Sequence, residues 1–138
     1  MQLLNFSGQV LLTGHSGYLG SIIRSFFPYV TSIGKKGADI FMDLSQNGTV
    51  DLPPADLIIH CAGKAHVFPK SKVEQELFYS VNVLGTQNLL NSIKLSDVKP
   101  KAFIFISSVA VYGKTSGELI TEEEELLATD PYGSSKLQ

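Results

Sequence analysis

The chain has 138 residues, of which 43% are hydrophobic and 17% charged, a balance typical of one globular domain with a real core. Its formal net charge of -2 comes from 11 basic and 13 acidic residues without a basic block, so nucleic acid is not an expected partner. One cysteine permits neither an internal disulfide nor a zinc cluster, and no apolar run approaches the roughly 20 residues of a membrane span, so we expect a cytoplasmic protein without a membrane segment.

Short runs rich in Val and Ile alternate with longer segments of helical period, which is the pattern of βαβ units. Residues 9–13 predict a first strand, and residues 21–27, beyond a glycine turn, predict a helix. Two short strands are predicted over 29–33 and 40–42, and residues 56–61 are typical of a central strand covered on both faces. The alternation predicts an α/β fold with a parallel sheet.

The longest predicted helix covers residues 72–94. Its apolar positions follow steps of four, four and three, which lay one apolar stripe along a helix. The residues of the stripe are Val73, Leu77, Val81 and Leu84. After this helix, residues 101–107 predict another buried strand.

A long connection over residues 109–129 mixes Gly, Ser and Thr with the acidic run 122–125, and connections of this length are often functional. Asp130 followed by Pro131 is typical of an N-cap and the first helical position, so a last helix should begin at Tyr132.

Three glycines between the first predicted strand and helix follow the spacing G-x-x-G-x-x-G. Glycine permits positive φ at the first turn and close approach to a pyrophosphate, and the N–H groups at a helix start favour the anion. The turn therefore predicts a dinucleotide site in a Rossmann-type doubly wound sheet with helices on both faces. Its expected cofactor contacts are Gly14, Ser16, Gly17, Tyr18, Leu19 and Gly20.

The choice between NAD and NADP stays open. An acidic residue about 20 positions after such a turn binds the adenosine ribose of NAD. Asp39 falls near that count, but the predicted second strand ends before Lys35 and Lys36, where no carboxylate stands. The two lysines could meet the 2′-phosphate of NADP or form a solvated turn, and Asp43 could bind adenine or cap the segment that starts at Ser45.

Only one of the five tyrosines, Tyr132, has a lysine four residues on, Lys136, and residues at this spacing share a helix face. An ammonium near a phenol favours the phenolate and makes tyrosine a usable base near neutral pH. Ser107 and Ser108 end the preceding strand, at the sheet edge where the glycine turn also opens. This arrangement predicts proton abstraction beside a bound dinucleotide.

In this order the motifs closely resemble the extended short-chain dehydrogenase/reductase family, also called NAD-dependent epimerase/dehydratases, which act mainly on nucleotide sugars. The resemblance runs from the first strand to the last residues and is strongest to 4-epimerases. Its motifs are the glycine turn 14–20, Asp43-Leu44, His60-Cys61-Ala62-Gly63, residues 82–90, residues 107–113, and residues 131–136.

The resemblance implies roles for four catalytic residues. Tyr132 is the acid/base, Lys136 lowers its pKa and holds the nicotinamide ribose, and Asn82 supports the hydrogen-bond network. Ser108, which stands four residues before Tyr112, binds the reacting hydroxyl in preference to Ser107. Further cofactor contacts are implied at Lys35, Asp43, Leu44, Cys61, Ala62, Gly63, Tyr132 and Lys136.

The implied reaction is oxidation at a sugar carbon followed by hydride return to the opposite face, as in a 4-epimerase. An NADPH-dependent 4-ketoreductase ranks second, because of Lys35 and Lys36 and because residues 65–67 are similar to reductase-like relatives. A dehydratase ranks lower, because the family's dehydratases carry Thr-Asp-Glu where this chain has Ser-Val-Ala at 108–110. The alternative of another class is a non-catalytic dinucleotide-binding module.

Residues 1–138 are expected to be the N-terminal part of an NAD(P)-binding domain whose later strands and substrate lobe are absent, so that the chain alone is inactive. A homodimer is expected. His60 is predicted to be a hydrogen-bonded strand-end residue, His66 a loop residue that could approach substrate, and Cys61 a core residue rather than a nucleophile.

Overall fold

A computed structural model describes residues 6–65 and 69–138. Its centre is a parallel sheet of five strands in the order β3-β2-β1-β4-β5. This order is the doubly wound arrangement, in which the chain starts at β1, moves outward one way to β3 and then the other way to β5. The Rossmann-type prediction is confirmed. The strands are β1 (Val10–Thr13), β2 (Val30–Gly34), β3 (Ile40–Phe41), β4 (Leu57–His60) and β5 (Ala102–Phe105).

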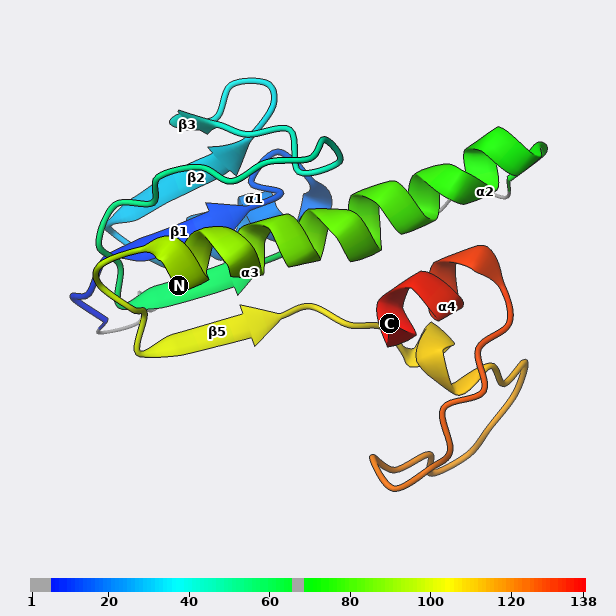
Figure 1. Cartoon of the computed structure of the whole chain (residues 1–138). Helices are drawn as coiled ribbons and strands as arrows, with labels where there is room; N and C mark the ends of the chain where they lie inside the picture. The colour runs from blue at the N-terminus through cyan, green and yellow to red at the C-terminus, as the bar shows by residue number, and fades with distance from the viewer. Residues whose placement is uncertain (1–5, 66–68) are drawn as a thin grey trace.

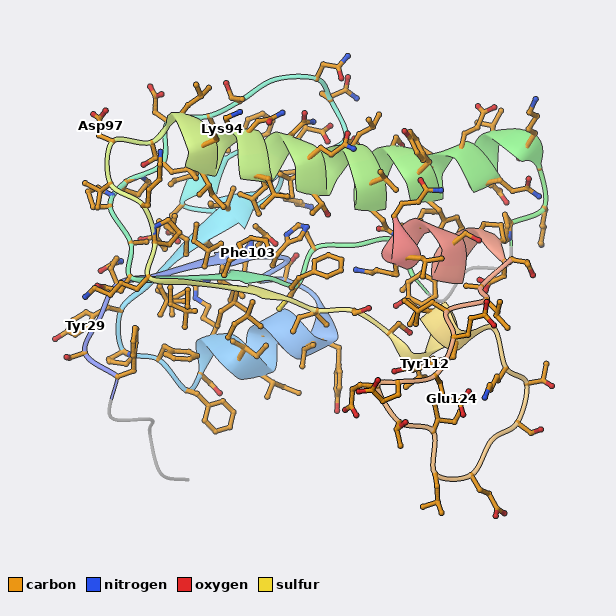
Figure 2. The ribbon with its side chains drawn as sticks, turned by 60° about the horizontal axis from the view of Figure 1, so that its bottom comes forward. Tyr29, Lys94, Asp97, Phe103, Tyr112 and Glu124 are labelled. Atoms are coloured by element: carbon orange, nitrogen blue, oxygen red, sulfur yellow. The ribbon has the colours of Figure 1, made fainter. Side chains whose placement is uncertain are left out.

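Helices cover both faces of the sheet. Helix α1 (Tyr18–Arg24) lies on one face, and a long helical rod lies on the other (Figures 1 and 2). The rod consists of α2 (Lys72–Phe78), the π-helical segment η1 (Tyr79–Leu84) and α3 (Gly85–Leu95). The chain then returns through β5 and the 3-10 helix η2 (Val109–Tyr112) to the last helix α4 (Pro131–Leu137), which lies beside α2 (Figure 1). No helix among the described residues is long and apolar enough to cross a membrane.

Alternate residues of the central strands point to opposite faces and form two separate cores. On the rod side, Leu11 and Ile58 pack with Leu89 of α3. On the α1 side, Leu12 and Ile59 pack against helix and loop residues that include Ile23 and Phe27. Every residue of β1 and β4 is buried, so the prediction of a central strand within residues 56–61 is confirmed.

The predicted apolar stripe of the long helix is only partly buried. Val73 is 67% and Leu77 is 42% exposed, and Val81 and Leu84 are half-buried, whereas Phe78 and Asn82 are buried. The buried face is partly polar and includes glycine, so counting apolar residues does not find it. A Cβ at Gly85, for example, would lie only 3.1 Å from the Cβ of Leu44.

The prediction that residues 101–107 form a buried strand is also wrong in part. The strand exists, but β5 is the outermost strand of the sheet, and Ile104 is 44% exposed on the face that α1 leaves uncovered. Phe103 and Phe105, on the other face, are half-buried (Phe103 is labelled in Figure 2). An apolar run is therefore no proof of burial on both faces when the strand lies at an edge.

The two helix starts differ in how well they were predicted. Helix α4 begins at Pro131, one residue before the predicted start. The Asp130 carboxylate accepts hydrogen bonds from the backbone N–H groups of Tyr132 (3.0 Å) and Gly133 (2.9 Å), so the N-cap prediction is confirmed. Helix α1 begins at Tyr18, three residues before the predicted start, because the last residues of the glycine motif already form its first turn.

Candidate active site

The glycine turn brings β1, α1 and the loop after β4 into close contact. Gly14 has φ +71°, and a Cβ there would lie 2.6 Å from the backbone nitrogen of Ala62. Gly20 is buried directly against the Gly14 carbonyl group, so a side chain there would push the helix off the strand. The positive φ of Gly14 agrees with the predicted reason for glycine at the first turn, whereas the close packing at Gly14 and Gly20 is a further reason that was not predicted.

A cavity of about 280 Å³ opens beside this turn. It lies where β1, β2 and β4 end, which is the edge at which doubly wound sheets bind ligands. Of the predicted cofactor contacts, the cavity gathers six, whereas Tyr18 is 86% exposed on α1. The six are Gly14, Ser16, Lys35, Asp43, Leu44 and Ala62.

Lys35 and Asp43 form an ion pair at the cavity rim, with Lys35 Nζ 2.9 Å from Asp43 Oδ2. The other carboxylate oxygen accepts hydrogen bonds from the backbone nitrogen (3.0 Å) and the hydroxyl group (2.6 Å) of Ser45. Burial would raise the pKa of Asp43, but the hydrogen bonds from Ser45 and Lys35 outweigh it and lower this pKa. Asp43 thus caps the segment at Ser45, one of the two roles predicted for it.

Asp39 does not line the cavity. Its Oδ2 accepts hydrogen bonds from the hydroxyl group (2.6 Å) and the backbone nitrogen (2.8 Å) of Ser32, and these bonds lower its pKa. The carboxylate is therefore used to connect β2 with the turn before β3. Lys36 lines the cavity beside Lys35.

Asn82 joins two segments that are far apart in the sequence. Its Oδ1 accepts a hydrogen bond from the Lys64 backbone nitrogen (2.7 Å), and its Nδ2 donates to the Lys64 carbonyl oxygen (3.1 Å) and to Ser135 Oγ (2.8 Å). Asn82 is only 2% exposed, so every polar atom of its amide is used inside the protein. The loop after β4 and helix α4 are thereby fixed to the long rod.

Lys136 reaches the end of β5. Its ammonium group donates a hydrogen bond to the Ile106 carbonyl oxygen (3.0 Å) and lies 4.8 Å from the centre of the Phe105 ring. A Cβ at Gly63 would lie 3.1 Å from Lys136 Nζ, so a side chain there would crowd the ammonium group. Burial lowers the pKa of Lys136, and Cys61 partly offsets this effect.

The segments that carry Tyr132 and Ser108 pack against each other. Ser108 caps η2, its Oγ accepting a hydrogen bond from the Ala110 backbone nitrogen (3.2 Å). A Cβ at Gly133 would lie 2.6 Å from the Ala110 carbonyl oxygen, so α4 and η2 meet at glycine. The Tyr132 ring lies 6.3 Å from the Phe78 ring of α2, centre to centre.

Some features were missed or cannot be placed. The contacts of Ser135 and of the Lys64 peptide groups with Asn82 had no separate signal in the sequence, apart from the position of Ser135 inside the Tyr132–Lys136 motif. Cys61 is half-buried beside β4, and burial raises its pKa, which agrees with a core residue. His66, predicted as a loop residue near substrate, lies outside the described residues.

A protein-family model described as GDP-mannose 4,6 dehydratase matches residues 47–138. UDP-glucose 4-epimerase of Mycoplasma genitalium is 41% identical, over 93% of this chain and 45% of the relative. GDP-6-deoxy-D-mannose reductase of Pseudomonas aeruginosa is 30% identical, over 94% of this chain and 44% of the relative. The chain therefore spans less than half the length of these curated relatives.

Solved structures agree with the fold and with a nucleotide cofactor. MoeE5, solved in complex with UDP-glucuronic acid and NAD, superposes with a TM-score of 0.76 at 26% identity, over 94% of this chain and 46% of that one. The RMD protein of Pseudomonas aeruginosa, solved with NADPH, gives 0.72 at 28% identity, with the same two coverages. The predicted cofactor class, NAD or NADP, is that of these neighbours.

Proposed function

The chain belongs to the extended short-chain dehydrogenase/reductase family, and from this premise we propose that it is the nucleotide-binding part of an NAD(P)-dependent nucleotide-sugar 4-epimerase. The observation that carries the proposal is the anchoring of α4, which carries Tyr132 and Lys136, to Asn82 through Ser135 and to the residue after β5 through the Lys136 ammonium group.

The cofactor cradle fits a dinucleotide, because Gly14 lets the backbone turn beside Ala62 and a cavity of about 280 Å³ follows it. When bound, NAD(P) would supply the acceptor of a hydride in the first half of the reaction and its donor in the second half. Tyr132 takes the proton of the sugar hydroxyl group as the carbon–hydrogen bond breaks, which leaves a keto-sugar. Tyr132 returns the proton to the carbonyl oxygen when the keto-sugar is reduced from the opposite face, which gives the epimer.

The neighbouring groups support this proton transfer. In this proposal the Lys136 ammonium group, which donates a hydrogen bond to the Ile106 carbonyl oxygen, binds a ribose of the cofactor. Ser108, held at the start of η2, donates to or accepts from the reacting hydroxyl group. Asn82 keeps α4 in place by its bond to Ser135.

A 4-ketoreductase that uses NADPH is the second candidate. It is favoured by Lys35 and Lys36, which line the cavity and can meet a 2′-phosphate, and by the relative and the structural neighbour from Pseudomonas aeruginosa. A dehydratase ranks lower despite the name of the family model, because residues 108–110 lack the acidic and Thr side chains of the family's dehydratases.

The proposal extends to the partners of the chain. The substrate is a nucleotide sugar, the location is the cytoplasm, and a second copy of the protein packs on the exposed apolar side chains of the rod, which include Val73 and Leu77. We further propose that residues 1–138 alone bind a dinucleotide weakly and turn over no sugar, because the relatives extend well beyond the matched part.

Two measurements test the function. An absorbance and fluorescence scan of the purified protein, before and after addition of NAD(P)H, tests cofactor binding. The reaction is tested on the longer enzyme, by which we mean the proposed protein that contains residues 1–138 as its nucleotide-binding part and has the length of the relatives. With UDP-sugars and GDP-sugars, epimer formation without net consumption of cofactor supports the 4-epimerase, whereas stoichiometric NADPH oxidation supports the ketoreductase. Binding without any turnover would favour a non-catalytic module.

A further inference from the structure

His60 is a buried histidine that the proposed reaction does not use. It has no exposed surface, and its ring stacks on Phe105 (5.8 Å between centres) and lies 6.3 Å from Phe103. No group of three or more potential metal ligands exists among the described residues, so a metal does not explain it. A buried imidazole needs a hydrogen-bond partner at each nitrogen.

Both nitrogen atoms have partners, and the directions of the bonds fix the tautomer. The Thr86 hydroxyl group donates its only proton to the Asn82 carbonyl oxygen (2.6 Å), so Thr86 Oγ1 can only accept a hydrogen bond from His60 Nε2 (3.0 Å). In the neutral ring Nε2 therefore carries the proton and Nδ1 is an acceptor. Thr13 Oγ1, which accepts a hydrogen bond from the Ala62 backbone nitrogen (3.1 Å), donates its own proton to Nδ1 over 2.6 Å.

The last hydrogen bond of this series runs from Thr86, near the start of α3, to Asn82 in the π-helical segment η1. The Gly85 N–H group donates to the Ser80 carbonyl oxygen, five residues back, so the helix is wound more widely here than an α-helix. The Thr86 hydroxyl group binds the Asn82 carbonyl oxygen in the same turn. Side chains that bond to a carbonyl group four residues back alter the local helix geometry, so this contact helps to set the direction in which Asn82 points.

We propose that His60 is a positioning residue, which links the strand of the glycine turn through Thr13 to the π-helical turn through Thr86 and thereby holds Asn82 toward Lys64 and Ser135. The inference rests on the proposed function, in which Asn82 supports the active site. Burial lowers the pKa of His60 to about 4, so the neutral ring persists at neutral pH and can act as acceptor and donor at the same time.

The tautomer is the first test. Long-range ¹H–¹⁵N NMR spectra of the 138-residue chain at pH 7 should show His60 neutral with its proton on Nε2. A proton on Nδ1, or a doubly protonated ring, would contradict the directions assigned to the hydrogen bonds and overturn the proposal.

A matched pair of variants tests the link to Asn82. Thr86→Val keeps the shape but removes the hydroxyl group, so exchange of the Asn82 side-chain amide protons should accelerate about tenfold. Thr86→Ser restores the hydroxyl group and should restore slow exchange. Equal exchange in Thr86→Val and in the unchanged chain would show that the link does not hold Asn82.

The histidine itself is tested by His60→Gln, which keeps an N–H donor near the position of Nε2, against His60→Leu. Slow exchange of the Asn82 amide should survive better in His60→Gln. If His60→Leu fails to fold, the Thr86 pair still decides the question.

Kinetics of the longer enzyme separates this inference from the proposed function. Thr86→Val should lower kcat about tenfold while the dissociation constant of the dinucleotide changes less than about twofold. If the unchanged enzyme turns over no nucleotide sugar but the amide exchange follows the expected pattern, the function fails and the positioning role holds. If the enzyme is active but Thr86→Val changes neither the exchange rate of the Asn82 amide nor kcat, the positioning role fails and the proposed function stands.

Discussion

Asn82 Nδ2 lies 2.8 Å from Ser135 Oγ, and this hydrogen bond joins the π-helical turn of the long rod to the helix that carries Tyr132 and Lys136. Ser135 Oγ in turn donates to the Tyr132 carbonyl oxygen (2.8 Å). Residues separated by more than fifty positions are thus fixed to one another beside the end of β5. The position of the proposed base depends on a polar contact and not only on apolar packing.

Replacement of Tyr132 by Phe in the longer enzyme should lower kcat by at least about 10²-fold, because a positioned acid/base typically supplies that factor. Dinucleotide affinity, measured by fluorescence titration, should stay the same. Ser108→Ala should cost less, since it removes a hydrogen bond and not the base. Comparable turnover by the Tyr132→Phe enzyme would exclude Tyr132 as the base.

Lys35 and Lys36 should favour NADPH over NADH if they face the adenosine ribose. Replacing both by Ala should lower NADPH affinity while NADH affinity stays nearly constant, because only NADPH carries the 2′-phosphate. The measurement is a titration of both nucleotides, with Lys94→Ala on α3 as the control for a lost surface charge. A preference that does not change would identify the two lysines as solvated surface.

Gly14 and Gly37 provide a matched pair for the glycine turn, since their φ angles are +71° and +68°. Gly37→Ala meets no atom within 4 Å, so it should cost only about 1–2 kcal/mol of stability from backbone strain. Gly14→Ala also drives a methyl group into the Ala62 backbone, so it should cost more and abolish nucleotide binding. Thermal melts and NAD(P)H titrations of both variants measure this, and equal effects would exclude close packing at Gly14.

His60 should make the free energy of unfolding depend on pH. Its pKa is lowered from 6.5 to about 4 in the folded chain, mainly by burial and secondly by Lys136, so the unfolded chain binds the proton more readily between these values. Stability should therefore be fully present above about pH 6.5 and fall by about 3 kcal/mol as the pH drops to about 4.

Urea titrations at pH 7.0 and 5.0 measure this effect. The carboxylates whose pKa is lowered, such as Asp39, titrate mostly below this window. In His60→Gln the difference in unfolding free energy between the two pH values should shrink, and an unchanged difference would show that His60 is not its source.

The sheet was predictable because its signals are local. The apolar run over residues 56–61 predicts a buried strand without knowledge of its neighbours, and the glycine spacing predicts the turn in the same way. The N-cap of α4 is predicted from Asp130 and Pro131 alone. The buried face of the long helix was not predictable, because Asn82 and Ser92 are polar and are buried only through partners that are distant in sequence. The exposure of β5 depends on strand order, which no run of residues specifies by itself.

In the candidate site, too, local motifs were predictable and contacts between distant segments were not. The motif that contains Tyr132 and Lys136 can be found in the sequence, but the hydrogen bond from the Lys136 ammonium group to Ile106 requires the end of β5 to lie beside α4. The capping of Ser45 by Asp43 was one of two expected roles, and the structure was needed to find its partner Lys35.

Asn82 holds residue 64 by its peptide N–H and carbonyl groups, whereas the Lys64 ammonium group lies elsewhere, 5.5 Å from the centre of the Phe78 ring. Hydrogen bonds to the main chain do not depend on the side chain, provided that the residue has a backbone N–H group. Every residue except proline can therefore be tried at position 64 in a directed-evolution library while the anchor of the loop after β4 is kept, so the chemistry beside Phe78 can be altered there.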